Sequence, residues 1–286
     1  DVYRGEADQP FNTFQHISRA IGNELKRSSD DTLTLTFKDK AEALNQAITT
    51  SGSPKCFGQV FNIEPVLEDA ALLKYRVHDG AIEDITQVRD GGLSVGFTKD
   101  LANGTFTLSA SAQGRITCDV KGAKTAGTWL QSAKQIIPEL AAAIGEVINS
   151  EDIELSDYLL GIYLNDETAL ATLLDAIAMS LMGYWRFDRF GAFHFKSMPI
   201  SFDVATASLN GDEIKLGSWH EQRELPPLKQ VEIGFKRNFT PQVDGLFGSV
   251  SASNREAYSK EQDAVEANNN LPQFPEAKTL TISSYL

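Results

Sequence analysis

Cysteines, basic residues and long apolar runs are scarce in this chain of 286 residues. Its two cysteines, Cys56 and Cys118, allow at most one bridge, which argues against a disulfide scaffold or a cysteine-based metal site. Lysine and arginine number 26 against 39 aspartates and glutamates, so the formal net charge is −13. That charge disfavours a nucleic-acid binder, which needs clustered basic side chains, and it equally disfavours docking on an anionic membrane.

The sequence also has no stretch typical of a membrane span or a secretory signal. The longest apolar candidate, residues 169–183, is interrupted by polar side chains and falls short of the roughly 18 apolar residues that a span needs. We therefore expect no stable membrane insertion. The first residues are polar and charged, and the chain begins without methionine. We expect an excised or processed part of a longer protein, incomplete at its C-terminus.

Residues 1–122 are predicted to form a first, barrel-like β region. Strict alternation over residues 32–38 places Leu33, Leu35 and Phe37 on one face, which predicts a half-buried strand. Apolar residues at helical spacing within 14–21 predict a short helix before it. Further strands are expected at 59–63, 72–77, 105–108 and 115–120. Turn signals separate them at Asp79-Gly80, Asp90-Gly91-Gly92 and Asn103-Gly104.

Residues 123–199 are predicted to form an α+β insertion of two helices and a hairpin. Apolar residues from Trp129 to Ile144 recur at helical spacing around Pro138, where we expect a kink or the start of a second helix. Another helix is expected after residues 165–167, with acids in its first turn and Gly183 at its end. An aromatic hairpin then packs on that helix. Its side chains are expected in the core rather than at an interface: Trp185, Phe187, Phe193 and Phe195.

Residues 200–286 are predicted to form a second barrel-like β region. Alternation predicts strands at 214–219 and 231–235, and a further strand at 279–286. Residues 251–275 are polar and contain three consecutive asparagines and two prolines, which predicts a long arm that contacts a neighbouring chain. The predicted fold class is therefore mixed β with an α+β insertion, in which barrel-like domains flank a unit of two helices and a hairpin.

Patterns that carry chemistry are few. Residues 92–96 match the G-x-S-x-G pattern of a nucleophile elbow, which requires a helix directly after the serine. The residues that follow have turn and strand character, so we interpret the pattern as a glycine-flanked hairpin. Nucleotide-binding motifs are missing, and the histidines lack the spacing of a zinc site. We predict no catalytic residue, no cofactor site and no metal site. The four histidines are His16, His78, His194 and His220.

Acidic side chains cluster at residues 151–157 and at Asp166-Glu167. Two carboxylates at the right separation would suit glycoside hydrolysis. In so acidic a chain, solvated loops and charges near a helix start are the simpler interpretation. Asn103 and Asn238 begin formal glycosylation sequons, which carry little weight without a secretory signal. The residues by themselves favour a structural or binding protein over an enzyme.

Seven runs, taken in order, carry a family resemblance. They are residues 54–67, 75–82, 88–92, 114–122, 161–164, 184–191 and 231–242. In this order they resemble a family of tail proteins of long-tailed bacteriophages and related prophages. That family is similar in turn to the tail-tip or baseplate hub of contractile-tailed phages. The ordered set, which spans nearly the whole chain, is what makes the resemblance specific.

The resemblance implies β-barrel-like hub domains around a helical insertion, in a homotrimer on the tail axis. Such a hub lies in the virion at the tail tip, joins the distal tail or tail tube to the central fibre or spike, and surrounds the channel for genome ejection. Two barrel domains per subunit would give a pseudo-hexameric ring that meets a six-fold tube. No catalytic residue follows from the family. Two interpretations of the acids remain open: a channel wall that lets DNA pass without binding it, or a surface that keeps the protein soluble.

Two other classes of function remain as alternatives. A host cell-wall-binding or peptidoglycan-degrading tail module would bind sugar through Tyr184, Trp185 and Trp219, and a pair such as Glu154 and Asp166 would do the chemistry. A receptor-binding protein would use the polar residues 251–275 as its contact surface.

Overall fold

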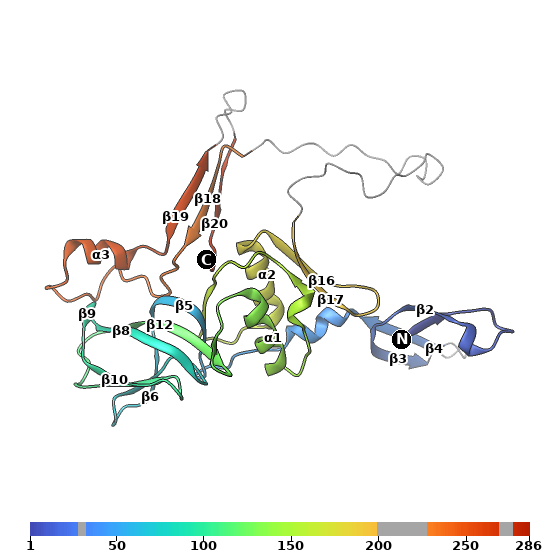
Figure 1. Ribbon diagram of the computed structural model, residues 1–286, viewed down its shortest axis with the longest axis horizontal. Helices are drawn as coiled ribbons and strands as arrows, with labels where there is room; N and C mark the ends of the chain where they lie inside the picture. Colours follow the sequence, from blue (N-terminus) through green and yellow to red (C-terminus); the bar gives the residue numbers. More distant parts are fainter. Residues whose placement is uncertain (28–32, 199–227, 269–276) are drawn as a thin grey trace.

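The computed structural model of the chain describes residues 1–27, 33–198, 228–268 and 277–286. Along the chain these residues form an N-terminal strand ribbon, a β region, an α+β unit and a C-terminal three-stranded sheet (Figure 1). The expected strand at 214–219, with Trp219 and His220, lies outside the described residues. Among the described residues, no helix is both long and apolar enough to cross a membrane.

Two sheets share the core of the β region. One has the strand order β15-β5-β12-β8-β9, with β13 paired to β12, and the other has the order β10-β11-β7-β6. Both contribute side chains to one buried cluster, for example Val60 and Val120 from the first sheet and Phe106 from the second. The strands are β5 (Lys55–Ile63), β6 (Val66–Asp69), β7 (Lys74–Arg76), β8 (Ile82–Asp90), β9 (Leu93–Ser94), β10 (Phe97–Asp100), β11 (Thr105–Leu108), β12 (Ile116–Thr125), β13 (Thr128–Trp129) and β15 (Gly161–Leu164).

The predicted β character of this region is confirmed, and its short-range turns are where the sequence places them. Asp90 pairs with Leu93 across the β8–β9 hairpin, and Asp100 pairs with Thr105 across the β10–β11 turn. Over the described residues each sheet is an open path of strands, so the barrel-like closure stays a prediction. The domain boundary at 122 also stays a prediction, and the boundary at 199 lies outside the described residues. Across the boundary at 122, β15 pairs antiparallel with β5.

The α+β unit consists of two helices and a small sheet around a second core. The helices are α1 (Ala133–Ala143) and α2 (Leu170–Ser180), and the sheet is β14 (Ile153–Glu154), β17 (Phe193–Ser197) and β16 (Gly183–Phe187) in the order β14-β17-β16. Phe193 and Phe195 are buried in the core, and Trp185 and Phe187 pack against it. The aromatic hairpin is therefore part of the core, as predicted.

Both helix starts differ from the predicted ones. Helix α1 begins at Ala133 because Trp129 belongs to β13, and it runs through Pro138 as a single element. Helix α2 has no acid in its first turn, since Asp166 and Glu167 precede it. Backbone pairing explains this shift: Thr168 accepts a hydrogen bond from the Ile48 N–H, and Ala169 forms a bridge with Ala47, which holds both residues extended.

The N-terminal residues form two strand pairs, which corrects the predicted helix at 14–21. β1 (Val2–Arg4) pairs with β2 (Gln15–Ser18), and β3 (Ile21–Arg27) pairs with β4 (Leu33–Lys38). A 3-10 turn, η1 (Phe11–Thr13), precedes β2. Pairing between strands overrides the local helical spacing here. The β3–β4 pair projects from the body, and η2 (Lys40–Asn45) leads the chain back toward it (Figure 1).

The C-terminal residues form a sheet with the order β19-β18-β20. Its strands are β18 (Gln230–Phe235), β19 (Asp263–Asn268) and β20 (Thr279–Ile282). The predicted arm at 251–275 is wrong over its described part, because α3 (Ala252–Ser259) and β19 lie there and Ser251 caps the helix through the Asn254 N–H. The strand predicted at 279–286 ends at Ile282. Tyr285 and Leu286 then pack against the core of the α+β unit.

Candidate functional site

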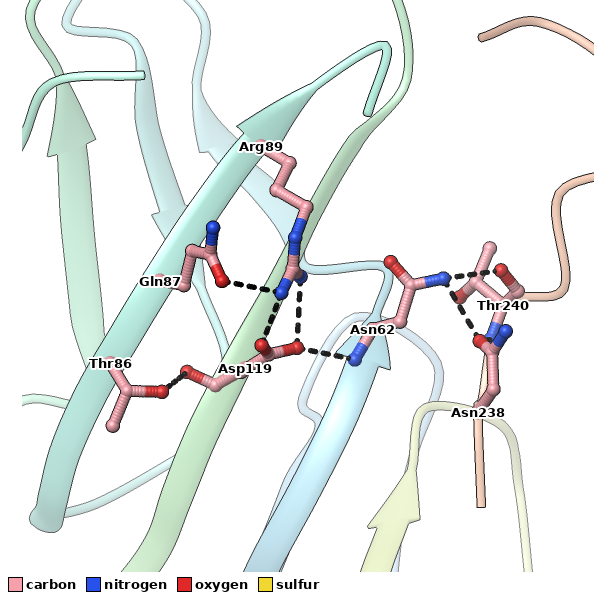
Figure 2. A network of polar contacts seen from close by, with 7 residues as sticks. All are labelled: Asn62, Thr86, Gln87, Arg89, Asp119, Asn238 and Thr240. Carbon is pink, nitrogen blue, oxygen red and sulfur yellow. Dashed lines mark hydrogen bonds and ion pairs between the residues drawn. The ribbon is translucent and has the colours of Figure 1, made fainter. Parts of the chain in front are cut away.

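Four of the seven runs that carry the family resemblance meet at one polar network (Figure 2). Asn62 comes from β5, Arg89 from β8 and Asp119 from β12, whereas Asn238 and Thr240 follow β18. We call these five residues the polar clasp. Residues as far apart in sequence as Asn62 and Asn238 are in direct contact there.

A buried ion pair forms the centre of the clasp. Arg89 Nη1 donates to Asp119 Oδ1 at 2.9 Å, and Nη2 donates to Asp119 Oδ2 and to Gln87 Oε1. The Arg89 and Asp119 side chains are only 7% and 15% exposed. Burial by itself lowers the pKa of Arg89, but the hydrogen bonds and charge of Asp119 outweigh it and raise that pKa. The guanidinium therefore stays charged.

Asn62 connects this ion pair to the C-terminal segment. Its backbone N–H donates to Asp119 Oδ1 at 2.8 Å, and its φ of 52° lies in the left-handed region that asparagine tolerates better than most residues. Its Nδ2 donates to Asn238 Oδ1 at 2.9 Å and to the Thr240 carbonyl at 2.7 Å. Asn238 Nδ2 in turn donates to the carbonyls of Tyr258 and Lys260. The Asn238 side chain thus joins its own loop after β18 to Asn62 in β5 and to the end of α3.

A fifth run, residues 161–164 in β15, contributes Tyr163 beside the polar clasp. The Tyr163 hydroxyl donates to the Glu64 carbonyl at 2.7 Å, and the Tyr163 ring meets the Phe239 ring edge-on with centroids 6.0 Å apart. Burial raises the pKa of Tyr163, so the phenol stays protonated and can donate. The Phe239 N–H donates to the Phe61 carbonyl at 3.2 Å, which adds a backbone contact.

Beside the clasp lies an open cleft of about 400 Å³ between the β region and α3. Arg89 and Asp119 line one side, and Tyr258 and Lys260 line the other. The Arg89 guanidinium lies over the Tyr258 ring, 5.3 Å from its centre. A salt-bridged arginine, two amides and a threonine hold segments together rather than transfer protons. The arrangement suits a joint between the first β region and the C-terminal segment.

The G-x-S-x-G pattern forms the hairpin that the sequence favoured. Gly91 and Gly92 turn the chain with positive φ, Ser94 ends β9, and β10 begins at Phe97. A strand rather than a helix follows the serine, so the nucleophile-elbow interpretation is wrong.

The described histidines are separate from one another. His16 lies 3.3 Å from Asp1, and His194 lies 3.6 Å from Asp188. His78 is buried and its Nδ1 accepts a hydrogen bond from the Cys56 N–H. Within residues 1–27, 33–198, 228–268 and 277–286, no three His, Cys, Asp or Glu side chains form a group that could hold a metal ion. Cys56 and Cys118 are buried and unbridged, and burial raises the pKa of both thiols.

The described residues of the cell-wall alternative lie in structural contacts, and Trp219 lies outside the described residues. Trp185 packs on the core and its Nε1 donates to Asp175 at 2.7 Å, and Tyr184 is half-buried. They therefore do not form the exposed sugar platform that this alternative requires. Glu154 pairs with Lys196 at 2.8 Å, and the Asp166 carbonyl accepts a hydrogen bond from the Thr49 hydroxyl.

Reasoning from the sequence did not identify the clasp. As the start of a sequon Asn238 would be expected at the surface, yet its side chain is buried and makes four hydrogen bonds within the chain. The available signal was that Asn62, Arg89, Asp119 and Asn238 all belong to runs that carry the resemblance. Nothing in the sequence said that these runs converge.

Comparisons with known proteins give two similar solved structures. No protein-family model and no curated protein matches the sequence. A chain in the virion of a native gene transfer agent particle aligns over 84% of this chain and 71% of its own length, with 13% identity and a TM-score of 0.47. The 43 kDa tail protein of prophage MuSo2 from Shewanella oneidensis aligns over 91% of this chain and 72% of its own, with 15% identity and a TM-score of 0.29. Both scores lie below 0.5, so neither likeness defines the fold or the function of this chain.

Proposed function

We propose that this chain is a structural component of a bacteriophage tail, and more narrowly a hub at the tail tip. The observation that carries the proposal is the ordered resemblance of seven runs to phage tail proteins. The structure supports it because five of these runs, which are dispersed in sequence, pack around the polar clasp and Tyr163. The two similar solved structures come from a virion and a tail, which agrees with the proposal without carrying it.

In this role the chain is a non-enzymatic homotrimer on the tail axis. It joins the distal tail or tail tube to a central fibre or spike and surrounds the channel through which DNA leaves. A joint such as the polar clasp suits this role, because a hub has to keep its β regions in fixed positions while it connects two different neighbours. The excess of 13 acidic charges suits a channel wall that repels phosphate.

Labelling of intact virions tests the position. An antibody against this chain, viewed by electron microscopy, should mark the distal end of the tail on its axis, and marking of the capsid would refute the proposal. A structure of the assembled ring tests the channel. We expect an acidic inner wall, and a neutral or basic wall would leave the acids as a solubility feature only.

The absence of enzymatic activity is a separate test. The purified chain should release no fragments from peptidoglycan. A Glu154→Gln variant serves as the matched control, since any real turnover through Glu154 would fall with it. Turnover that this substitution abolishes would establish the cell-wall alternative instead.

A further inference from the structure

Two buried polar atoms in the wall of the cleft beside the polar clasp lack hydrogen bonds. Among the described residues, Arg89 Nε has no acceptor and Asn62 Oδ1 has no donor. Both residues line the cleft, although Arg89 is only 6% exposed and Asn62 only 4% exposed. An unpaired buried polar atom is unfavourable and rare in folded proteins. A group that supplied both hydrogen bonds would therefore bind favourably here.

The orientation of the Asn62 amide is fixed by its neighbours. Its Nδ2 donates to Asn238 Oδ1 and to the Thr240 carbonyl, so exchanging the nitrogen and oxygen of the amide would lose both bonds. Figure 2 shows the Asn62 oxygen on the other side of the amide, turned away from Asn238 and toward Arg89. The unpaired acceptor and the unpaired donor thus belong to one part of the cleft wall.

A hydroxyl is the group that suits this pair of atoms. Its oxygen can accept from Arg89 Nε while its hydrogen donates to Asn62 Oδ1, whereas an ionised carboxylate only accepts and an ammonium only donates. The Oε1 of Gln262 lines the same cleft and also has no donor among the described residues. The Gln262 amide is held in place because its Nε2 donates to Ser283 Oγ at 3.3 Å. A ligand with several hydroxyls would supply all of these hydrogen bonds.

The charges of the cleft wall balance, which favours a neutral ligand. Arg89 is paired with Asp119, and Lys260 lies 2.9 Å from Glu256. A phosphate or a metal cation would therefore meet no excess of opposite charge. Three cationic and three anionic side chains line the cleft: Arg89, Lys236, Lys260, Asp119, Glu256 and Asp263.

We propose that this cleft binds a neutral saccharide. One hydroxyl of the sugar accepts from Arg89 Nε and donates to Asn62 Oδ1, and a second hydroxyl donates to Gln262 Oε1. The cleft volume of about 400 Å³ lies within the range of roughly 300–1,000 Å³ that is typical of small-molecule sites. This binding activity goes beyond the tail role proposed above. It also uses a different surface from the cell-wall alternative, which placed the sugar on Tyr184 and Trp185.

Tyr258 controls access to the unpaired atoms. Its ring lies over the Arg89 guanidinium, 5.3 Å from the ring centre, and helps to raise the pKa of Arg89 without hydrogen-bonding Nε. The ring is half-buried, and α3 has no buried residue of its own. A change of the Tyr258 rotamer would therefore uncover Arg89 and Asn62 without disturbing a core. The sugar then takes the place of the ring against the guanidinium.

Saturation-transfer NMR on the full chain tests the binding, because this method observes the ligand and tolerates a large assembly. The probes are four neutral disaccharides: maltose, lactose, cellobiose and N,N′-diacetylchitobiose. We expect at least one of them to receive saturation from the protein, and we expect inorganic phosphate not to displace it. No saturation of any of the four would overturn the proposal, as would displacement by phosphate. The virion labelling described above tests the tail function independently of either outcome.

Two alanines of α3 provide a matched pair of variants. Ala252 and Ala257 are both exposed, and of the two only Ala257 lines the cleft. Ala257→Leu narrows the cleft and should weaken saccharide binding about tenfold to a hundredfold, whereas Ala252→Leu should leave it unchanged.

Arg89→Lys tests the hydrogen bond itself. Lysine keeps a positive charge beside Asp119 but has no N–H at the position of Nε, so the variant should also bind the saccharide more weakly. Urea unfolding shows whether this variant is still folded, and Ala257→Leu carries the test if it is not. Binding that survives in Ala257→Leu would place the saccharide elsewhere on the chain and overturn the proposal.

Discussion

The buried ion pair of the polar clasp makes a quantitative prediction about stability. The Asp119 carboxylate accepts hydrogen bonds from Arg89 Nη1 and Nη2 and from the Asn62 N–H. The substitution Asp119→Asn replaces this carboxylate with a neutral amide. The Arg89 side chain is 7% exposed, so its guanidinium would stay buried without a counter-charge. Breaking a buried pair in this way costs about 3–5 kcal/mol. In a domain of this size that corresponds to a fall in Tm on the order of 10 °C.

The assay is urea unfolding followed by circular dichroism, with limited proteolysis of the C-terminal segment as a local probe. Glu83→Gln is the matched control, because Glu83 forms an ion pair of similar length, 2.7 Å, with Lys124 at the surface. The side chains of Glu83 and Lys124 are about one third exposed, so losing this ion pair should lower the free energy of unfolding by less than about 1 kcal/mol. Asp119→Asn should also expose residues 237–262 to protease, since Asn62 would lose its anchor.

A double variant separates charge burial from packing. Replacing both partners, with Arg89→Met and Asp119→Leu in one chain, removes the two charges together and leaves no isolated guanidinium. We expect it to be more stable than Asp119→Asn alone. Equal losses for Asp119→Asn and Glu83→Gln would refute the reasoning, because the clasp would then contribute no more than a surface pair.

Two further predictions concern a buried histidine and a close backbone approach. Burial, with Lys55 and Arg76 nearby, lowers the pKa of His78 from 6.5 to about 4 despite Asp79. Because the folded protein favours the neutral imidazole, the contribution of His78 to the free energy of unfolding is fully present above pH 6.5 and is lost toward pH 4. The free energy of unfolding should therefore fall by about 2 kcal/mol between pH 7.5 and pH 5. Urea unfolding at both pH values should show this loss, and His78→Asn should remove most of it. Gly58 has a φ of +61°, and the Cβ of Gly58→Ala would overlap the Leu160 carbonyl oxygen. We expect this substitution to lower the free energy of unfolding by about 3 kcal/mol in the same urea assay. Gly52→Ala is the control, since Gly52 also has a positive φ but open surroundings, and it should cost about 1 kcal/mol.

Local signals in the sequence identified elements whose causes are themselves local. Asp90-Gly91-Gly92 predicted a hairpin because glycine accepts the positive φ of a tight turn, and both glycines have it. The aromatic hairpin was predicted correctly because Phe193 and Phe195 alternate with polar residues. The start of α2 was missed because backbone pairing with residues 46–48 holds Thr168 and Ala169 extended. That cause lies about 120 residues away and leaves no trace in the local pattern.

The polar clasp shows the same limit for the site. Asn62 and Asn238 are 176 positions apart, and each looks like an ordinary turn or strand-end asparagine in its own run. The resemblance selected the right runs because it depends on the whole chain. It could not say that the runs meet, since contact between distant segments follows from the path of the fold rather than from residue spacing.

The β3–β4 pair shows that a failed burial prediction can still carry information. Alternation over residues 32–38 predicted one covered face, yet Leu35 and Phe37 are about half exposed. The alternation itself is real, because β4 is a strand with its apolar residues on one side. Exposing the apolar side of a strand to water is unfavourable. The alternation in β4 is therefore typical of a strand whose apolar side is covered, whereas the described residues of this chain leave that side exposed. In the C-terminal sheet Val265 and Leu280 are also exposed, at 62% and 40%. The alternation in β4 therefore predicted the strand and the face that its apolar residues share, but not how far that face is buried among the described residues.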